Sequence, residues 1–224
     1  MTRAIAPILL GLAGIAILLW LGLWQMQRLE WKRGILTEIE TTIAGAPQPL
    51  PSLVAPDEQR YAPVDLSGRI GAEALFVLVS VKQRGAGWRV ISGFETEDGR
   101  RVLLDRGYVP VVDKTAPLRD DLLEVEGNLH WPDDRNSSTP ENDQDGNIWY
   151  ARDIAAMAEV LGTEPLLVVA RRITPPDPGL TPLPVDTSGI PNDHLQYAVT
   201  WFSLAAVWFL MTALWTWRRL KEGP

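Results

Sequence analysis

The stretch HLQYAVTWFSLAAVWFLMTALWTW, residues 194–217, decides the fold of this chain. It lies in a run of 24 residues without a formal charge, between Asp193 and Arg218. At about 1.5 Å per residue this run makes a helix roughly 36 Å long, whereas the hydrocarbon core of a bilayer is about 30 Å thick. The stretch therefore predicts a transmembrane helix at residues 194–217.

A second run of 24 uncharged residues lies between Arg3 and Arg28 and predicts a transmembrane helix at residues 4–27. Its apolar part is longer than that of a signal peptide. It also ends in the bulky sequence LWLGLWQMQR instead of the small residues of a cleavage site. We therefore expect an uncleaved membrane anchor.

The basic residues that flank the spans indicate the orientation. Three of them follow the second span in the tail 218–224, whereas the 20 residues before that span contain no Lys or Arg. The tail is therefore expected in the cytoplasm, and two spans place the N-terminus there as well. The first span alone favours the opposite orientation, because Arg28, Lys32 and Arg33 follow it. We give priority to the second span and expect both termini in the cytoplasm and the main domain on the outer side of the membrane.

Charge and cysteine content exclude several classes of function. Residues 28–193 hold 17 Lys and Arg against 27 Asp and Glu, a net charge of −10. Such a surface repels phosphates, so no nucleic-acid partner is expected. The absence of cysteine excludes disulfides, iron–sulfur clusters and thiolate metal sites. A bound metal or haem therefore needs His, Met, Tyr or carboxylate ligands.

Prolines delimit the domain between the spans. Ten of the 18 prolines fall in residues 45–56 and 174–191, and proline-rich stretches favour extended linkers. The sequence thus predicts an amphipathic stem and linker at 28–56, a folded domain at 57–173 and a second linker at 174–193.

Short runs of β-branched and other apolar residues predict the strands of this domain. They lie near residues 62–69, 75–82, 87–94, 101–109, 121–129 and 166–173. Asp98-Gly99 predicts a type I′ hairpin turn, and residues 151–162 predict a helix that Gly162 terminates. Antiparallel strands with one late helix are typical of a β-rich α+β domain, either an antiparallel sheet or an open barrel.

His194 is the principal candidate for ligand binding. If Asn192 or Asp193 caps the second span, His194 lies in the first helical turn, where the helix dipole disfavours a protonated imidazolium. A neutral imidazole is the form that binds metals. Steps of seven residues from His194 reach Trp201, Trp208 and Trp215, with Tyr197, Ala198 and Phe202 beside them. The pattern predicts an aromatic face suited to a flat apolar ligand, but a hydrated histidine at the membrane boundary fits it too.

The first span offers an opposing face. Trp20, Trp24, Gln27, Arg28 and Trp31 recur at helical spacing, and Arg28 with Lys32 would suit the propionates of a haem. The plainer interpretation is that Trp and Arg anchor the helix at the lipid headgroups. Gly11, Gly14 and Gly22 lie near one face and favour close helix packing.

Other motifs are incomplete. The segment ENDQDGNIWYAR resembles a calcium loop through Asp143, Asp145 and Gly146, but Arg152 stands where a bidentate Glu is needed. His130 has Asp133 and Asp134 nearby, yet the sequence places no serine nucleophile beside it. An enzyme is therefore not expected.

Four segments together resemble the Surfeit-locus 1 family of assembly factors for cytochrome c oxidase. They occur in the family's order at residues 21–32 (LGLWQMQRLEWK), 99–110 (GRRVLLDRGYVP), 140–166 and 192–205 (NDHLQYAVTWFSLA). The resemblance covers nearly the whole chain and implies two spans that flank a domain outside the inner membrane.

The resemblance also implies a function. It implies that the chain binds haem a transiently and delivers it to the catalytic subunit of a haem-copper oxidase, with haem a synthase as a further candidate partner. By matching positions, His194 corresponds to the proposed axial ligand of the haem iron. Trp24, Gln25 and Arg28 correspond to a motif of the first span, and Arg106 and Gly107 to a motif of the domain. The alternative is a cofactor-free scaffold whose acidic domain holds oxidase subunits during assembly.

Overall fold

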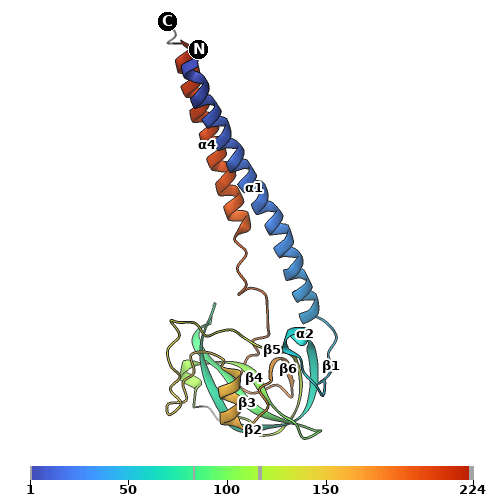
Figure 1. Cartoon of the computed structure of the whole chain (residues 1–224). Coiled ribbons are helices and arrows are strands. Elements are labelled where there is room, and N and C mark those ends of the chain that lie inside the picture. The colour runs from blue at the N-terminus through green and yellow to red at the C-terminus, as the bar shows by residue number, and fades with distance from the viewer. Residues whose placement is uncertain (1, 83, 116–117, 222–224) are drawn as a thin grey trace. The chain divides into compact units, whose positions relative to one another are not determined.

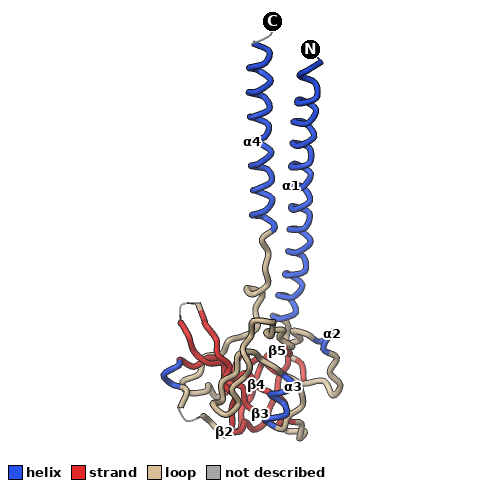
Figure 2. The backbone as a smooth tube through the Cα atoms, turned by 60° about the vertical axis from the view of Figure 1, so that its left-hand side comes forward, coloured by secondary structure: helices blue, strands red, loops and turns tan. Residues whose placement is uncertain are grey.

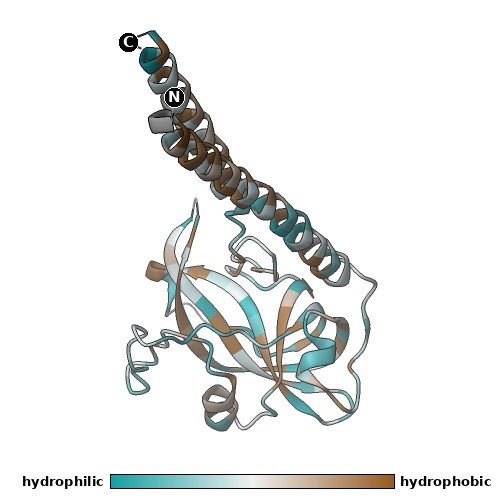
Figure 3. Ribbon diagram, turned by 45° about the horizontal axis from the view of Figure 1, so that its top comes forward, coloured by the Kyte–Doolittle hydropathy of each residue, from teal (hydrophilic) through white to brown (hydrophobic). Residues whose placement is uncertain are grey.

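The computed structural model describes residues 2–82, 84–115 and 118–221. The chain forms two units: one comprises the two terminal segments through Glu38 and from Thr187, and the other comprises Ile39–Asp186. The terminal unit contains the helices α1 (Thr2–Ile43, whose last turns enter the other unit) and α4 (His194–Lys221). Both are long and apolar enough to cross a membrane, and Figure 3 shows the hydrophobic colour along them.

The central unit is a β-rich domain. Its strands are β1 (Gln48–Pro49), β2 (Pro63–Val81), β3 (Gly85–Thr96), β4 (Arg101–Pro110), β5 (Leu122–His130) and β6 (Leu167–Thr174). Short helices at α2 (Pro56–Gln59), η1 (Val111–Asp113) and α3 (Ile154–Leu161) complete it. The labels are those of Figure 1, and Figure 2 shows the strands in red.

The strands close into a barrel. The order is β2-β3-β4-β6-β5, and β5 returns to pair with β2. Neighbours are antiparallel except β4 and β6, which pair in parallel over three residues, and β1 adds a short parallel edge to β2. The predicted β-rich fold is confirmed, and the barrel is closed because β2 is long enough to pair with both β3 and β5.

Two predicted strands proved to be one. The runs at 62–69 and 75–82 form the single 19-residue strand β2, whose register shifts between Ile70 and Ala74. The hairpin at Asp98-Gly99 is confirmed, but its turn type is not. Gly99 has a positive φ of 84°, whereas Asp98 does not share it, so the turn is not type I′. The loop instead follows the longer hairpin pattern in which one glycine takes the left-handed position.

Side chains alternate between two apolar clusters across β4 and β6. Val102 and Leu104 of β4 belong to one cluster, and Leu103 between them belongs to the other, which α3 covers with Met157 and Leu161. Helix α3 begins at an Asp153 cap and ends at Gly162 in the left-handed conformation, as predicted. Both faces of these strands are therefore buried, which fixes their register.

The proline-rich segments are not free linkers along their whole length. The first contains β1 and α2, and Leu50 and Val54 pack against the barrel core. In the second, Thr181 pairs with Tyr108 of β4. The boundaries 57–173 therefore require correction, because the compact unit extends over 39–186. Proline composition showed where the chain is extended but not that the extended chain packs on the barrel.

Candidate functional site

Helices α1 and α4 form an antiparallel pair, and the described ends of the chain lie at the same end of it (Figure 1). Each glycine of the α1 face lies against a larger side chain of α4. Gly11 meets Thr212, Gly14 meets the Trp208 indole, and Gly22 meets the Phe202 ring. A Cβ at Gly22 would lie only 2.5 Å from that ring. The predicted packing role of these glycines is thus confirmed, and it follows the pairing of small with large residues common in membrane helices.

The contact follows a heptad pattern on both helices. On α1, Gly22 and Leu29 are buried and lie seven residues apart. On α4, the buried residues Ala198 and Ala205 are also seven apart. A repeat of seven keeps one seam of each helix toward the other. Small residues on the seam let the two backbones approach closely.

One polar pair lies within this apolar seam. Nδ1 of His194, the first residue of α4, is 2.8 Å from Oε1 of Gln25 on α1. Gln25 is 9% exposed, and His194 is partly buried. The backbone oxygen of Asp193 accepts the first hydrogen bond of α4 from Tyr197. His194 therefore lies at the positive end of the helix dipole, as the sequence indicated.

The contact is compatible with one tautomer of neutral His194 when Oε1 of Gln25 faces the ring. Because a carbonyl oxygen can only accept, that placement requires the proton on Nδ1. In neutral imidazole the other nitrogen, Nε2, then keeps its lone pair. Histidines that bind metals generally donate their second ring N–H to a polar partner, which fixes the ring orientation. The pair is therefore arranged as a metal-binding histidine with its supporting hydrogen bond.

The structure brings only some predicted site residues together. Gln25 contacts His194, and Trp201 lies partly buried on the same face of α4. Trp24 is 42% exposed and Tyr197 is 55% exposed. Arg28 is also exposed, and its guanidinium stacks 4.5 Å from the centre of the Trp31 ring.

The predicted opposing face therefore needs a correction. We expected Trp20, Trp24 and Arg28 to face the His194 stripe, but all three are exposed on α1. The seam instead carries Gln25, because the close packing of the glycines sets the rotation of α1. A heptad count on α1 would have revealed this, since Gly11 and Gln25 are separated by two full heptads.

An unmatched donor lies one heptad from His194. The indole Nε1 of Trp201 is buried and has no hydrogen-bond acceptor among the described residues. Buried polar atoms without a partner are uncommon in folded proteins. An acceptor on a bound ligand would satisfy this donor.

His194 belongs to no cluster of candidate metal ligands among the described residues. Within residues 2–82, 84–115 and 118–221, no group of three or more His, Asp or Glu side chains is placed to hold a metal ion. The calcium-like segment is a turn in which Asp143 Oδ1 accepts from the Gly146 amide, 2.9 Å away. One imidazole suits a metal whose other ligands come with it, as the porphyrin nitrogens come with haem iron.

A second polar cluster lies in the barrel, at positions the sequence singled out. The buried guanidinium of Arg106 pairs with the buried Asp177, with 2.6 Å between nitrogen and oxygen. Gly107 has φ of 113°, and a Cβ there would collide with the Thr181 carbonyl. These contacts fasten residues 177–181 to β4. No sequence signal indicated Asp177, because it lies 71 residues from Arg106 in a segment expected to be a linker.

The remaining histidine, His130, occupies a structural position. It ends β5, and its ring stacks on Tyr61 with 5.5 Å between ring centres. Burial, assisted by the nearby Arg152 charge, lowers the pKa of His130 to about 4. Beside it, Arg152 pairs with Asp134. His130 therefore stays neutral within the barrel domain at neutral pH.

Sequence comparisons identify the family of the chain. The sequence model of the SURF1 family matches residues 12–206, which include most of α1, the whole barrel and the first part of α4. Surfeit locus protein 1 of Xenopus tropicalis is 34% identical over 212 residues, which cover 83% of this chain and 68% of that protein. The human protein of the same name is 30% identical, with 83% and 69% covered.

A bacterial relative matches over a larger share of its own length. The SURF1-like protein of Rickettsia bellii is 28% identical over 201 residues, covering 85% of this chain and 82% of the relative. The family match spans most of the chain, from the glycine face of α1 to the His194 end of α4. The chain belongs to the SURF1 family.

Proposed function

We propose that this protein is a haem a carrier that binds the haem iron through Nε2 of His194 and delivers the haem to the catalytic subunit of a haem-copper oxidase. The observation that carries the proposal is the hydrogen bond from His194 Nδ1 to Gln25 Oε1, 2.8 Å long. With the proton on Nδ1, the lone pair of Nε2 would be free to bind the iron, which supports the proposal. Family membership adds the resemblance to oxidase assembly factors.

A single protein ligand suits a carrier. His194 alone would bind the haem iron, so the haem could be released to a recipient by exchange of one protein ligand. Porphyrin is flat and apolar, and the half-exposed aromatic residues Trp24, Tyr197 and Trp201 offer surfaces on which it can pack. The protein then supplies binding and orientation, and no catalytic step is required of it.

Arg28 is proposed to bind a haem propionate. Its side chain is exposed, and no acidic side chain pairs with it in the described part of the chain. A guanidinium matches a carboxylate through two parallel hydrogen bonds. Because Arg28 already stacks on Trp31, it loses less side-chain entropy when it binds a propionate.

The proposed location is the bacterial inner membrane, with both termini in the cytoplasm and the barrel domain in the periplasm. Arg218, Arg219 and Lys221 lie in the last turn of α4, and cytoplasmic ends of spans favour such residues. The antiparallel pair places the N-terminal end of α1 beside them (Figure 1). The oxidase catalytic subunit and haem a synthase are the proposed partners in this membrane.

The two histidines of the chain provide a direct test. The protein is co-expressed with enzymes that make haem a, purified in detergent, and its absorbance spectrum recorded. His194→Ala is expected to lose most of the bound haem and to change the Soret band, because the iron loses its protein ligand. His130→Gln is the matched control and is expected to retain both, since His130 stacks on Tyr61 inside the barrel domain. Equal haem content in the two variants would contradict the proposal.

The scaffold alternative rests on the charge of the domain. Residues 39–186 hold 14 Lys and Arg against 24 Asp and Glu, a surface that favours basic partners. A deletion strain separates the two functions. A carrier predicts oxidase that assembles without its haem a, whereas a scaffold predicts fewer oxidase complexes, each with a full haem complement.

A further inference from the structure

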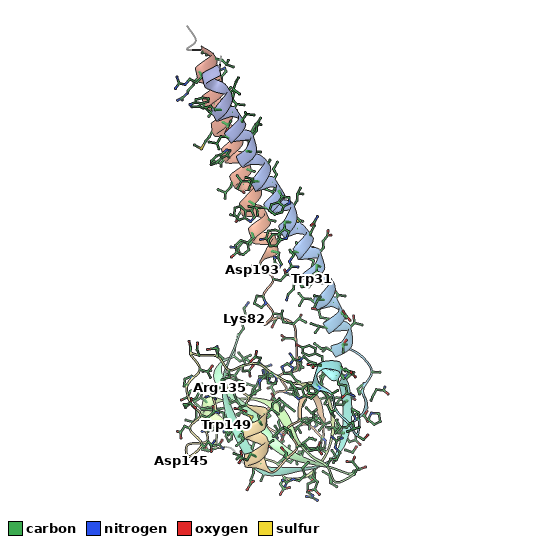
Figure 4. All side chains as sticks on the ribbon, viewed as in Figure 1. Trp31, Lys82, Arg135, Asp145, Trp149 and Asp193 are labelled. Atoms are coloured by element: carbon green, nitrogen blue, oxygen red, sulfur yellow. The ribbon has the colours of Figure 1, made fainter. Side chains whose placement is uncertain are left out.

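The β2–β3 hairpin projects beyond the barrel. The last residue pair of β3 with β4 is Gly87 with Pro110, but β2 and β3 continue to pair through Val81 and Gly85. On the other side of β2, β5 pairs only with residues 63–69. Figure 4 shows Lys82 at the far end of this hairpin. The hairpin tip is therefore free of the barrel walls.

The base of the tip is held in place. The Tyr108 ring lies over Gly87, where a Cβ would collide with it. The Tyr108 hydroxyl lies 3.2 Å from the backbone oxygens of both Arg84 and Ala86, to which it donates its hydrogen. Tyr108 therefore holds the backbone of Arg84 and Ala86 at the start of β3.

The tip and the neighbouring η1 turn form an apolar surface. Leu78 is 43% exposed and Val112 is 85% exposed, and Val111 beside it is also exposed. Val111 follows Pro110, the partner of Gly87, so the turn lies next to the hairpin. Exposed apolar residues on a projecting hairpin promote aggregation unless something covers them.

The hairpin part of this surface is basic within an acidic domain, whereas η1 contributes the exposed Asp113. Residues 74–94 contain no Asp or Glu, although acidic residues outnumber basic ones by 24 to 14 over residues 39–186. Lys82 and Arg84 are exposed at the tip, and among the described residues neither has an ion-pair partner. Lys114, by contrast, is committed to the Trp88 ring and to two backbone oxygens.

We infer that the hairpin tip docks on the surface of the membrane and binds anionic lipid headgroups. Lys82 and Arg84 bind lipid phosphates, and Leu78, Val111 and Val112 enter the interface. The domain is tethered to a membrane span. Residues 187–193 can extend at most about 25 Å, so the tether gives the domain a high effective concentration of lipid. Docking in this way is independent of haem binding.

Because the chain contains no cysteine, a single introduced cysteine can be labelled specifically. The full chain with Val112→Cys carries one environment-sensitive fluorophore and is placed in nanodiscs. One set contains phosphatidylcholine alone, and the other also contains phosphatidylglycerol, both with nitroxide-labelled lipid as quencher. The matched control is Val160→Cys, an equally apolar site that is 49% exposed on α3. Val160 lies near Leu161, which contacts Arg101 at the opposite end of β4, so roughly 30 Å separates the probes.

The fluorophore at position 112 is expected to be quenched in nanodiscs that contain phosphatidylglycerol, and the fluorophore at position 160 is not. Lys82→Gln with Arg84→Gln is expected to lower the ratio of docked to free domain by about fivefold for each side chain replaced. Equal quenching at the two positions, or equal quenching of position 112 with and without phosphatidylglycerol, would overturn the inference. Unchanged thermal unfolding of the Gln variant establishes that its fold is intact.

Discussion

The helix pair and the barrel bury polar groups in different ways. In the barrel, the Arg106 guanidinium meets the Asp177 carboxylate, so a buried charge is neutralised by its opposite. In the helix pair, an imidazole meets an uncharged amide, and one ring nitrogen of His194 has no role in the contact. The first arrangement joins two opposite charges and fastens residue 177 to β4, whereas the second involves only one of the two ring nitrogens of His194. This difference separates a structural polar cluster from a candidate binding site.

The largest effect is expected from breaking the barrel pair. Arg106→Ala leaves the Asp177 carboxylate buried and unpaired, which should cost about 3–5 kcal/mol in the free energy of unfolding. Arg172→Ala, which removes an exposed partner of Glu126, should cost about 1 kcal/mol or less. Chemical denaturation of the full chain in detergent measures both. Similar costs for the two variants would show that the buried pair does not hold β4 to residue 177.

A smaller effect is expected at the helix pair, where the quantity that changes is the affinity for haem. Gln25→Met removes the acceptor for His194 Nδ1 with little change in volume, and should weaken haem binding about 10- to 100-fold. Gln27→Met, at an exposed position on the same helix, should leave binding unchanged. Haem titration followed by absorbance gives the affinities. If both variants bind as the parent chain does, the hydrogen bond does not position the ligand.

The same substitution at two glycines of α1 should have opposite effects. Gly22→Ala places a methyl group 2.5 Å from the Phe202 ring, and such overpacking typically costs about 1–3 kcal/mol. Gly34→Ala meets no atom within 4 Å and should stabilise α1 by about 0.5–1 kcal/mol, because alanine favours helix. Thermal unfolding by circular dichroism reports the sign. If Phe202→Leu restores the stability of the Gly22→Ala variant, the clash lies between these two positions in the seam.

A pH dependence is expected in the barrel domain. Burial lowers the pKa of His130 to about 4, whereas an unfolded histidine titrates near about 6.5. Between these values the unfolded chain binds a proton that the folded chain does not, so stability falls as the pH falls. His130→Gln should reduce this slope between about pH 7 and 5, where carboxylates contribute little. If the slope of stability against pH is the same in the His130→Gln variant, other titratable groups cause the pH dependence.

Much of the barrel was readable from the sequence. Every predicted strand region lies in a strand, because alternating β-branched residues must place one face on a core. Two predicted strands merged into β2, because a shift of register between Ile70 and Ala74 interrupts the apolar pattern without ending the strand. Closure of the barrel was not readable, since the pairing of β2 with β5 joins residues about 60 positions apart.

For the candidate site, local pattern and tertiary contact had separate roles. The heptad of His194, Trp201 and Trp208 was visible in the sequence, as were the glycines opposite. The choice of Gln25 over Trp24 or Arg28 as the partner of His194 was not, because residues on neighbouring faces of a helix differ by a rotation that only packing determines.

By itself, the sequence determined that two uncharged spans flank a β-rich domain and that a histidine begins the second span. These features depend on hydrophobicity and local propensity, which each segment carries alone. The tertiary structure decided which side chain that histidine contacts and which arginine is buried. Both depend on a partner far away in the chain, Gln25 for His194 and Asp177 for Arg106, and only the folded backbone brings such partners within hydrogen-bond distance.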